Sequence, residues 1–186
     1  MRIVSGQLKG RRFSPPPSFH ARPTTDQARE NLFNILNNLI HFDEQRVLDL
    51  FAGTGAISYE FASRGAREIV CVEKNFAHFR FIKKTAEELG IAPPLKAVKA
   101  DVFKFLSRDT GTYSLIFADP PFDLPRLQTL PEWVFNSGHL EKEGMFILEH
   151  GPDMNFGQNP FFQQTRHYGK VNFSFFGSGE HFNSPT

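Results

Sequence analysis

Strand-length apolar runs alternate with stretches of helical periodicity from Arg46 to His150, and this alternation constrains the fold more than any other feature of the sequence. Strands joined by helices pair in parallel, and the helices then cover both faces of the sheet. The expected strands are Val47–Phe51, Ile69–Glu73, Leu95–Ala100, Tyr113–Asp119 and Met145–His150, and the expected helices are Ala56–Arg64, Phe76–Leu89, Val102–Ser107 and Leu127–Asn136. The sequence therefore predicts a doubly wound, Rossmann-like α/β domain.

The C-terminal part of the chain departs from this alternation. Residues 161–176 read "FFQQTRHYGKVNFSFF", which is two strand-like runs about a glycine turn. This pattern predicts an antiparallel hairpin at the edge of the sheet. We expect the α/β domain to span residues 24–178 and residues 179–186 to be a frayed tail.

The N-terminal part, residues 1–23, is predicted to be a basic arm with short strands around Arg2–Ser5 and Arg11–Ser14. A helix should follow the arm, with Thr24 as its N-cap and Gln27 three residues on. The first 30 residues carry six basic side chains against two acidic ones, whereas the whole chain has a net charge of +1. Each phosphate that a cation neutralises releases counterions, so such an arm suits RNA contact; a solvated tail is the alternative.

Composition and patterning exclude several classes of protein. No apolar run approaches the roughly 18 residues that span a bilayer, and "MRIVSGQLKGRR" contains no signal-type segment, so we expect a soluble, cytoplasmic protein. Cys71 lies in the apolar run "IVCVE" and is interpreted as a buried hydrophobe. The seven histidines lack metal-ligand spacing, so no metal site is predicted. A monomer is the default expectation.

In such sheets ligands bind beyond the carboxyl ends of the strands. The first strand ends within the sequence "LDLFAGTGA". Asp49 precedes a turn in which Gly53 and Gly55 would let a ligand approach the backbone. The dinucleotide fingerprint wants a third glycine where this chain has Ser58, which argues against a nicotinamide cofactor.

The next two strands also end in carboxylates. Glu73 is placed to accept hydrogen bonds from ribose hydroxyls. Asp101 could accept from the amino group of an adenine, with Val102 lining the ring pocket. Glu73 or Asp101 alone could equally be an ordinary helix N-cap or loop residue, but the two together predict an adenosine site.

The fourth strand ends in "IFADPPFDLP", residues 116–125. Proline has no N–H and a fixed φ, so Pro120 and Pro121 would hold the Pro120 carbonyl in one direction. That carbonyl and the Asp119 carboxylate would accept both hydrogens of an amino group, and Phe122 would stack on a flat heterocycle. The turn is therefore predicted to bind an exocyclic amine of a nucleobase.

These stretches resemble a known family. "VLDLFAGTGAISYEFASRGA", "VCVEKN", "VKADVFKFL" and "DPPF" are similar to the motifs of class I S-adenosylmethionine-dependent methyltransferases that act on amino groups. The arm "RIVSGQLKGRRF" and "RPTTDQARENLFNIL" narrow the resemblance to the RsmD family of 16S ribosomal RNA guanine-N2 methyltransferases. It runs from Arg2 to about Phe176 and implies the strand order 3-2-1-4-5-7-6, with strand 7 antiparallel.

The resemblance also assigns roles to residues. It implies that S-adenosyl-L-methionine is bound by Thr25, Asp49, Phe51, Ala52, Gly53, Thr54, Gly55, Glu73, Lys74, Asp101 and Val102. The implied catalytic group is Asp119, Pro120, Pro121 and Phe122, and the implied RNA contacts are Arg2, Lys9, Arg11, Arg12 and Arg22. The segment 151–160 has no counterpart that can be aligned.

The activity that this resemblance implies is methyl transfer to N2 of guanine 966 in 16S ribosomal RNA during ribosome biogenesis. The expected partner is that RNA within a partly assembled 30S particle. Two other functions stay open from the residues alone: an adenine-N6 DNA methyltransferase, because it shares the "DPPF" motif, and a non-catalytic RNA-binding or assembly protein that retains the fold.

Overall fold

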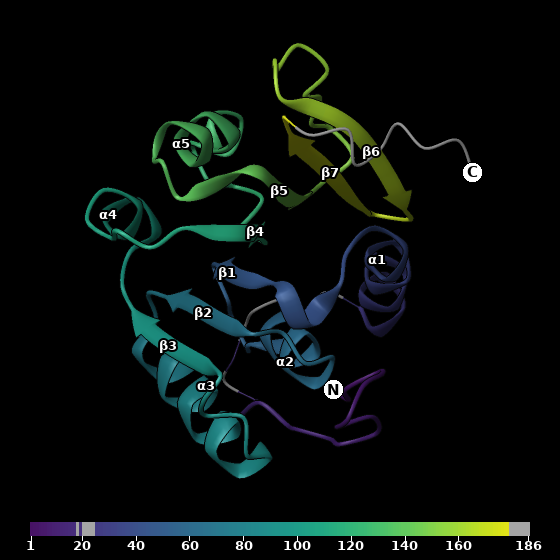
Figure 1. Ribbon diagram of the computed structural model, residues 1–186, viewed down its shortest axis with the longest axis vertical. Coiled ribbons are helices and arrows are strands. Elements are labelled where there is room, and N and C mark those ends of the chain that lie inside the picture. The colour runs from purple at the N-terminus through teal and green to yellow at the C-terminus, as the bar shows by residue number, and fades with distance from the viewer. Residues whose placement is uncertain (18, 20–24, 179–186) are drawn as a thin grey trace.

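A computed structural model describes residues 1–17, 19 and 25–178. Its centre is a seven-stranded sheet in the order β3-β2-β1-β4-β5-β7-β6, running from bottom to top in Figure 1. The strands are β1 (Arg46–Leu50), β2 (Glu68–Glu73), β3 (Leu95–Lys99), β4 (Tyr113–Ala118), β5 (Leu140–His150), β6 (Phe162–Tyr168) and β7 (Val171–Gly177). β1 to β5 pair in parallel, and β7 is antiparallel to both β5 and β6. The predicted strand order and hairpin are confirmed.

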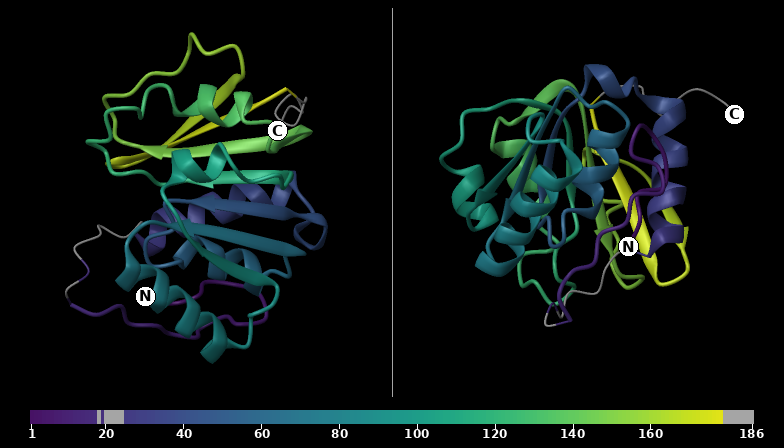
Figure 2. Two further views of the ribbon diagram at one scale, coloured as in Figure 1. Left: turned by 90° about the vertical axis from the view of Figure 1, so that its left-hand side faces the viewer. Right: turned by 90° about the horizontal axis from the view of Figure 1, so that it is seen from below.

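Helices cover both faces of the sheet, as the alternation predicts (Figure 2). The helices are α1 (Asp26–Leu39), α2 (Ala56–Ser63), α3 (Phe76–Leu89), α4 (Val102–Leu106) and α5 (Leu130–Asn136), with a 3-10 turn, η1, at Phe42–Glu44. Alternate strand residues point to opposite faces: Val47 and Phe117 pack with α1, α2 and α3, whereas Leu48 and Ile116 pack with α4 and α5. Two separate cores thus hold the strands in register.

Several predicted boundaries of strands and helices differ from the observed ones by one residue, and three further differences have a clear physical reason. Thr25 caps α1, because its Oγ1 accepts a hydrogen bond from the Ala28 N–H at 3.1 Å, while the predicted cap Thr24 lies outside the described residues. The last helix begins at Leu130, since the preceding residues form successive turns after the proline-rich segment. β5 begins at Leu140, because Leu140 pairs with Tyr113 of β4, and a register shift separates this pair from the next one, Leu115 with Met145.

The N-terminal arm is docked along α2. Arg2 and Arg12 form an antiparallel bridge that turns the apolar side chains of Ile3 and Phe13 into the core, where they are 1% and 7% exposed. The turn of the arm lies on the last residue of α2: the Gln7 N–H donates to the Ser63 carbonyl at 2.7 Å, and the Leu8 N–H donates to Ser63 Oγ at 2.9 Å. The arm therefore shares the core of the α/β domain.

The carboxyl ends of β1, β2, β3 and β4 lie on one edge of the sheet, and the arrowheads of β1 and β2 mark it on the left of Figure 1, on the side of α4. None of the helices in the described part of the chain combines the length and apolar character needed to cross a membrane. The predicted tail, residues 179–186, lies outside the described residues.

Candidate cofactor and substrate site

The turn between β1 and α2 has an unusual backbone. Phe51 has φ +61°, a left-handed conformation that residues with a side chain rarely adopt. Gly53, at φ +55°, has open space where a Cβ would stand, since its nearest atom is 3.9 Å away. A Cβ on Gly55 would lie 2.7 Å from the Tyr59 ring. Gly53 thus leaves room for a ligand, whereas Gly55 leaves room for the core.

Asp49 is the buried acid beneath this turn, only 2% exposed. Ser58, the residue that breaks the dinucleotide fingerprint, donates from its Oγ to Asp49 Oδ2 at 2.5 Å. Burial raises the pKa of Asp49 to about 7, and the charges of Asp119 and Glu73 add to the rise, while the Ser58 hydrogen bond opposes it. No cation of the described chain is paired with Asp49. The site is suited to a ligand that brings a positive charge.

Glu73, at the end of β2, is tied to the glycine turn. Its Oε2 accepts from the Gly53 N–H at 2.8 Å, and its Oε1 accepts from the Asn75 N–H at 2.6 Å. Each carboxylate oxygen keeps a second lone pair. Glu73 can therefore accept from ribose hydroxyls while it holds the turn in place.

Asp101 follows β3 and caps α4 by accepting from the Lys104 N–H at 3.3 Å. Partial burial would raise the pKa of Asp101, but the hydrogen bonds from Lys74 Nζ, 3.2 Å away, and from Lys104 outweigh it and lower the pKa. Val102 is 3% exposed and packs in the α4–α5 core, so it offers a ligand little surface. Asp101 thus stays ionised at the edge next to Glu73.

The catalytic turn predicted after β4 lies beside this site. The Asp119 N–H donates to the Leu50 carbonyl of β1 at 3.4 Å, which joins the turn to the end of the neighbouring strand. The Pro121 carbonyl accepts from the Leu124 N–H at 2.9 Å. Among the described residues no donor is bonded to the Pro120 carbonyl, and Pro120 itself is buried. Phe122 is 45% exposed.

The exposed ring of Phe122 rests on a residue that the sequence did not single out. An added Cβ on Gly151 would lie 3.4 Å from Phe122 Cδ2, so the ring packs on the bare face of this glycine. The Gly151 carbonyl lies 2.7 Å from His150 Nδ1, and Asn172 Nδ2 donates to it at 3.4 Å. His150 Nε2 lies 2.7 Å from Ser174 Oγ. Buried polar groups of β5 and β7 thus fix the support of Phe122.

Burial lowers the pKa of His150, and the nearby charge of His167 adds to this, while the Gly151 carbonyl opposes it. A neutral imidazole has one donor and one acceptor nitrogen. Donation from Nδ1 to the Gly151 carbonyl leaves Nε2 to accept from the Ser174 hydroxyl. The segment 151–160, which could not be aligned, is held near this group by Phe156, whose ring meets the His150 ring edge-on at 5.0 Å.

A buried ionic cluster links the arm, α1 and α2, and hydrophobic periodicity does not reveal it. Arg29 is 0% exposed and Glu60 is 1% exposed. Arg29 Nε donates to Glu60 Oε1 at 3.2 Å, and its Nη2 donates to the Arg2 carbonyl at 2.7 Å and to Asp26 at 2.8 Å. Glu60 also accepts from Arg64 and from the Val4 N–H. This cluster fixes the arm against the helix that follows the glycine turn.

The remaining predicted residues are placed as follows. Thr54 is 8% exposed, and its hydroxyl donates to the sulfur of Met1 at 3.7 Å, so its side chain faces the arm. Ala52 packs against the core of α1, α2 and α3. The arm cations that the structure describes, Arg2, Lys9, Arg11 and Arg12, are all exposed. Arg22 lies outside the described residues.

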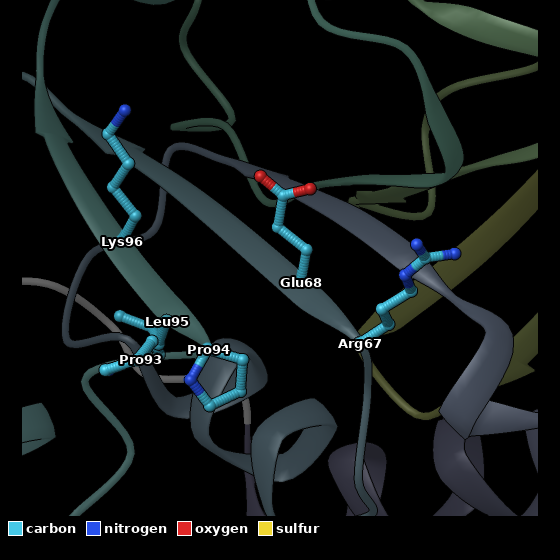
Figure 3. A pocket seen from close by; sticks show the side chains of 6 residues that line it. All are labelled: Arg67, Glu68, Pro93, Pro94, Leu95 and Lys96. Atoms are coloured by element: carbon cyan, nitrogen blue, oxygen red, sulfur yellow. The ribbon is translucent and has the colours of Figure 1, made fainter.

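A separate, open cavity of about 490 Å³ lies at the amino ends of β2 and β3, lined by residues that include Glu68, Pro94 and Lys96 (Figure 3). This is the opposite edge of the sheet from Glu73 and Asp101, so the cavity is separate from the candidate site. The described residues include no cluster of His, Cys, Asp and Glu suited to a metal ion.

The sheet has the strand order of the class I methyltransferase fold, with an antiparallel seventh strand. The acids and the glycine turn lie at its carboxyl edge. The family described as Conserved hypothetical protein 95 matches residues 1–177. The chain belongs to this family, the RsmD family of ribosomal RNA methyltransferases.

Individual relatives agree with this assignment. The putative rRNA methyltransferase YlbH of Bacillus subtilis is 32% identical over 154 residues, 81% of this chain and 82% of that protein. The ribosomal RNA small subunit methyltransferase D of Escherichia coli is 33% identical over 149 residues, 80% of this chain and 74% of that protein. A solved structure, the putative methyltransferase yhhF from Escherichia coli, is 28% identical with a TM-score of 0.82, covering 95% of this chain and 96% of that one.

Proposed function

We propose that this protein transfers a methyl group from S-adenosylmethionine to N2 of a guanine in small-subunit ribosomal RNA. The observation that carries the proposal is the turn of Asp119 to Phe122, which offers two acceptors and an exposed ring next to the carboxyl ends of β1 and β2. The names of the Escherichia coli and Bacillus subtilis relatives support ribosomal RNA as the substrate.

The residues of the candidate site fit the proposed cofactor. The Asp49 carboxyl, buried without a cation, suits the ammonium of the methionine part. Gly53 leaves space for the methionine part of the cofactor to approach the backbone. Glu73 suits the ribose, and Asp101 suits the amino group of the adenine. Bound S-adenosylmethionine supplies a methyl group activated by its sulfonium.

The chain itself would orient the amine. The lone pair of an exocyclic amine is delocalised into the base, which makes the free amine a poor nucleophile. The Asp119 carboxylate and the Pro120 carbonyl would accept its two hydrogens and localise the lone pair towards the methyl group. As the N–C bond forms and the S–C bond breaks, the amine loses a proton to Asp119 or to water. Positioning of this kind can provide much of the rate acceleration.

Phe122 would hold the base once it has left its stack, as enzymes that modify a base require. The cations of the docked arm would contact phosphates of the RNA. The arm reaches the glycine turn where the Thr54 hydroxyl donates to the sulfur of Met1 at 3.7 Å, and Arg2 is the next residue along the arm. Since the arm is fixed to α2, these cations form part of one rigid surface.

The test is transfer of tritiated methyl groups to small-subunit particles that lack the modification, followed by nucleoside analysis. N2-methylguanosine is the expected product, and naked 16S RNA serves as the comparison substrate. N6-methyladenosine would assign the amine chemistry to adenine, and absence of product would refute the proposal. Asp119→Ala should lower the rate at least about a hundredfold, yet S-adenosylhomocysteine should still bind. Loss of that binding would make Asp119 a cofactor or structural residue.

A further inference from the structure

An aromatic and cationic group lies on the α4–α5 face of the sheet. It consists of Phe103 of α4, Trp133 of α5 and Arg126 from the loop after the catalytic turn, and is called the Trp133 cluster below. The two rings meet edge to face, with centroids 5.3 Å apart. The Arg126 guanidinium lies 5.3 Å from the centre of the Phe103 ring and 5.5 Å from that of Trp133.

The Trp133 cluster presents both apolar surface and charge to solvent. Trp133 is 38% exposed, and in the described part of the chain only two other large hydrophobic side chains, Phe76 and Phe122, stand out as exposed. Arg126 is exposed as well. Among the described residues no carboxylate forms an ion pair with it, so its charge is available to an anion. A purely structural packing role would not require this exposure.

The position of the cluster relates it to the candidate site. Phe103 follows Asp101 and Val102 at the start of α4, and Arg126 lies in the loop that begins with Asp119 to Phe122. α4 and α5 are neighbours on one face of the sheet, seen on the left of Figure 1. The cluster therefore lies on the side of the carboxyl edge where both the proposed adenine site and the catalytic turn open.

We propose that the Trp133 cluster binds an unpaired nucleotide that neighbours the methylated guanine, with its base stacked on the exposed indole and its phosphate beside Arg126. This inference rests on the proposed function, since it presupposes an RNA substrate. Aromatic rings bind splayed bases of single-stranded RNA by stacking, and arginine binds phosphate through charge-assisted hydrogen bonds. A base taken out of its stack at Phe122 leaves its neighbour without one stacking partner, and the indole replaces that partner.

Trp133 is the only tryptophan of the chain, so its fluorescence reports on this surface alone. Titration with a single-stranded oligoribonucleotide should quench the emission saturably, whereas the same strand in a duplex should quench it far less. Trp133→Leu should weaken binding of the labelled single strand at least about fivefold by anisotropy, and Trp133→Phe should retain most of the affinity. Binding of S-adenosylhomocysteine should not change in either variant.

Arg126 is tested by salt. Arg126→Ala should reduce the slope of log affinity against log salt by about 0.7, the value for one phosphate of a single strand, and Arg126→Lys should restore it.

Absence of quenching, or unchanged RNA affinity in a folded Trp133→Leu variant, overturns the inference, as does loss of S-adenosylhomocysteine binding. If Trp133 is quenched but the protein methylates no small-subunit particles, the proposed function fails and the RNA site stands. If Trp133→Leu methylates with an unchanged KM for RNA, the function stands and this site fails.

Discussion

Gly6 should be the most sensitive position of the arm. It has φ +81°, and a Cβ there would lie 2.0 Å from the Ser63 carbonyl oxygen and 2.6 Å from Ser63 Oγ. Gly6→Ala would therefore strain the backbone by about 1–2 kcal/mol and force the arm away from the end of α2. Three hydrogen bonds link Ser5, Gln7 and Leu8 to Ser63, and losing them would cost about 1 kcal/mol each. The expected total is about 4–5 kcal/mol.

Gly10→Ala is the matched control, because Gly10 has φ +83° in the same arm and nothing lies within 4 Å of its added Cβ. This variant should lose only the strain energy of about 1–2 kcal/mol. The difference of about 3 kcal/mol between the variants corresponds to roughly 1.5 M in the urea midpoint, for an m-value near 2 kcal/mol/M. Hydrogen exchange at the Val4 and Leu8 amides should also lose protection in Gly6→Ala alone. Equal midpoints for the two variants would refute docking of the arm on Ser63.

The other predictions concern the ionisable groups and the Phe122 support. The folded state raises the pKa of Asp49 from 3.8 to about 7. The free energy of unfolding should therefore fall by up to about 1.4 kcal/mol per pH unit as pH rises between these values, and level off above them. In Asp49→Asn, urea unfolding should no longer show this dependence on pH, and a dependence that persists would belong to another group. Glu60→Gln should cost about 3–5 kcal/mol, because Arg29 stays buried and keeps only the partly exposed Asp26 as an ionic partner. Glu68→Gln breaks a partly exposed pair with Arg46 and should cost less than about 1 kcal/mol. Similar losses in the two variants would contradict the role of burial. Gly151→Ala should be tolerated, because its methyl group would lie at ordinary contact distance from the Phe122 ring. Gly151→Val should displace the ring and raise the KM for RNA, while S-adenosylhomocysteine still binds. Equal KM values in the two variants would show that Gly151 does not support the ring.

The parallel sheet and its helices could be predicted because both depend on hydrophobic periodicity within short segments. The alternation from Arg46 to His150 predicted the layers of the fold. Boundaries were less predictable, since they depend on single hydrogen bonds: Thr24 and Thr25 are chemically equal caps, and only the contact of Thr25 with the Ala28 N–H distinguishes them.

The position of Asp49, Glu73 and Asp101 at one edge could also be predicted, because each lies at or just beyond the end of a strand and parallel strands end at one edge; their roles in binding stay predictions. What supports them was not found. Ser58 reaches Asp49 across the glycine turn, and Gly151 reaches Phe122 from another strand. Such contacts join segments that are distant in the sequence, whereas hydrophobic periodicity describes only one short segment at a time. The pairing of Arg29 with Glu60 is a further case, because it joins α1 to α2.

The support of Phe122 by β7 has a consequence for the order in which the protein becomes active during synthesis. β7 inserts between β5 and β6 and supplies Asn172 and Ser174, which hold the Gly151 carbonyl and His150. A growing chain can complete the glycine turn, Glu73 and Asp101 well before these residues leave the ribosome. It would then bind its cofactor while the platform for the target base is still loose. Under the proposed function, the growing chain would therefore become able to methylate RNA only after β7 has paired with β5 and completed the support of Phe122.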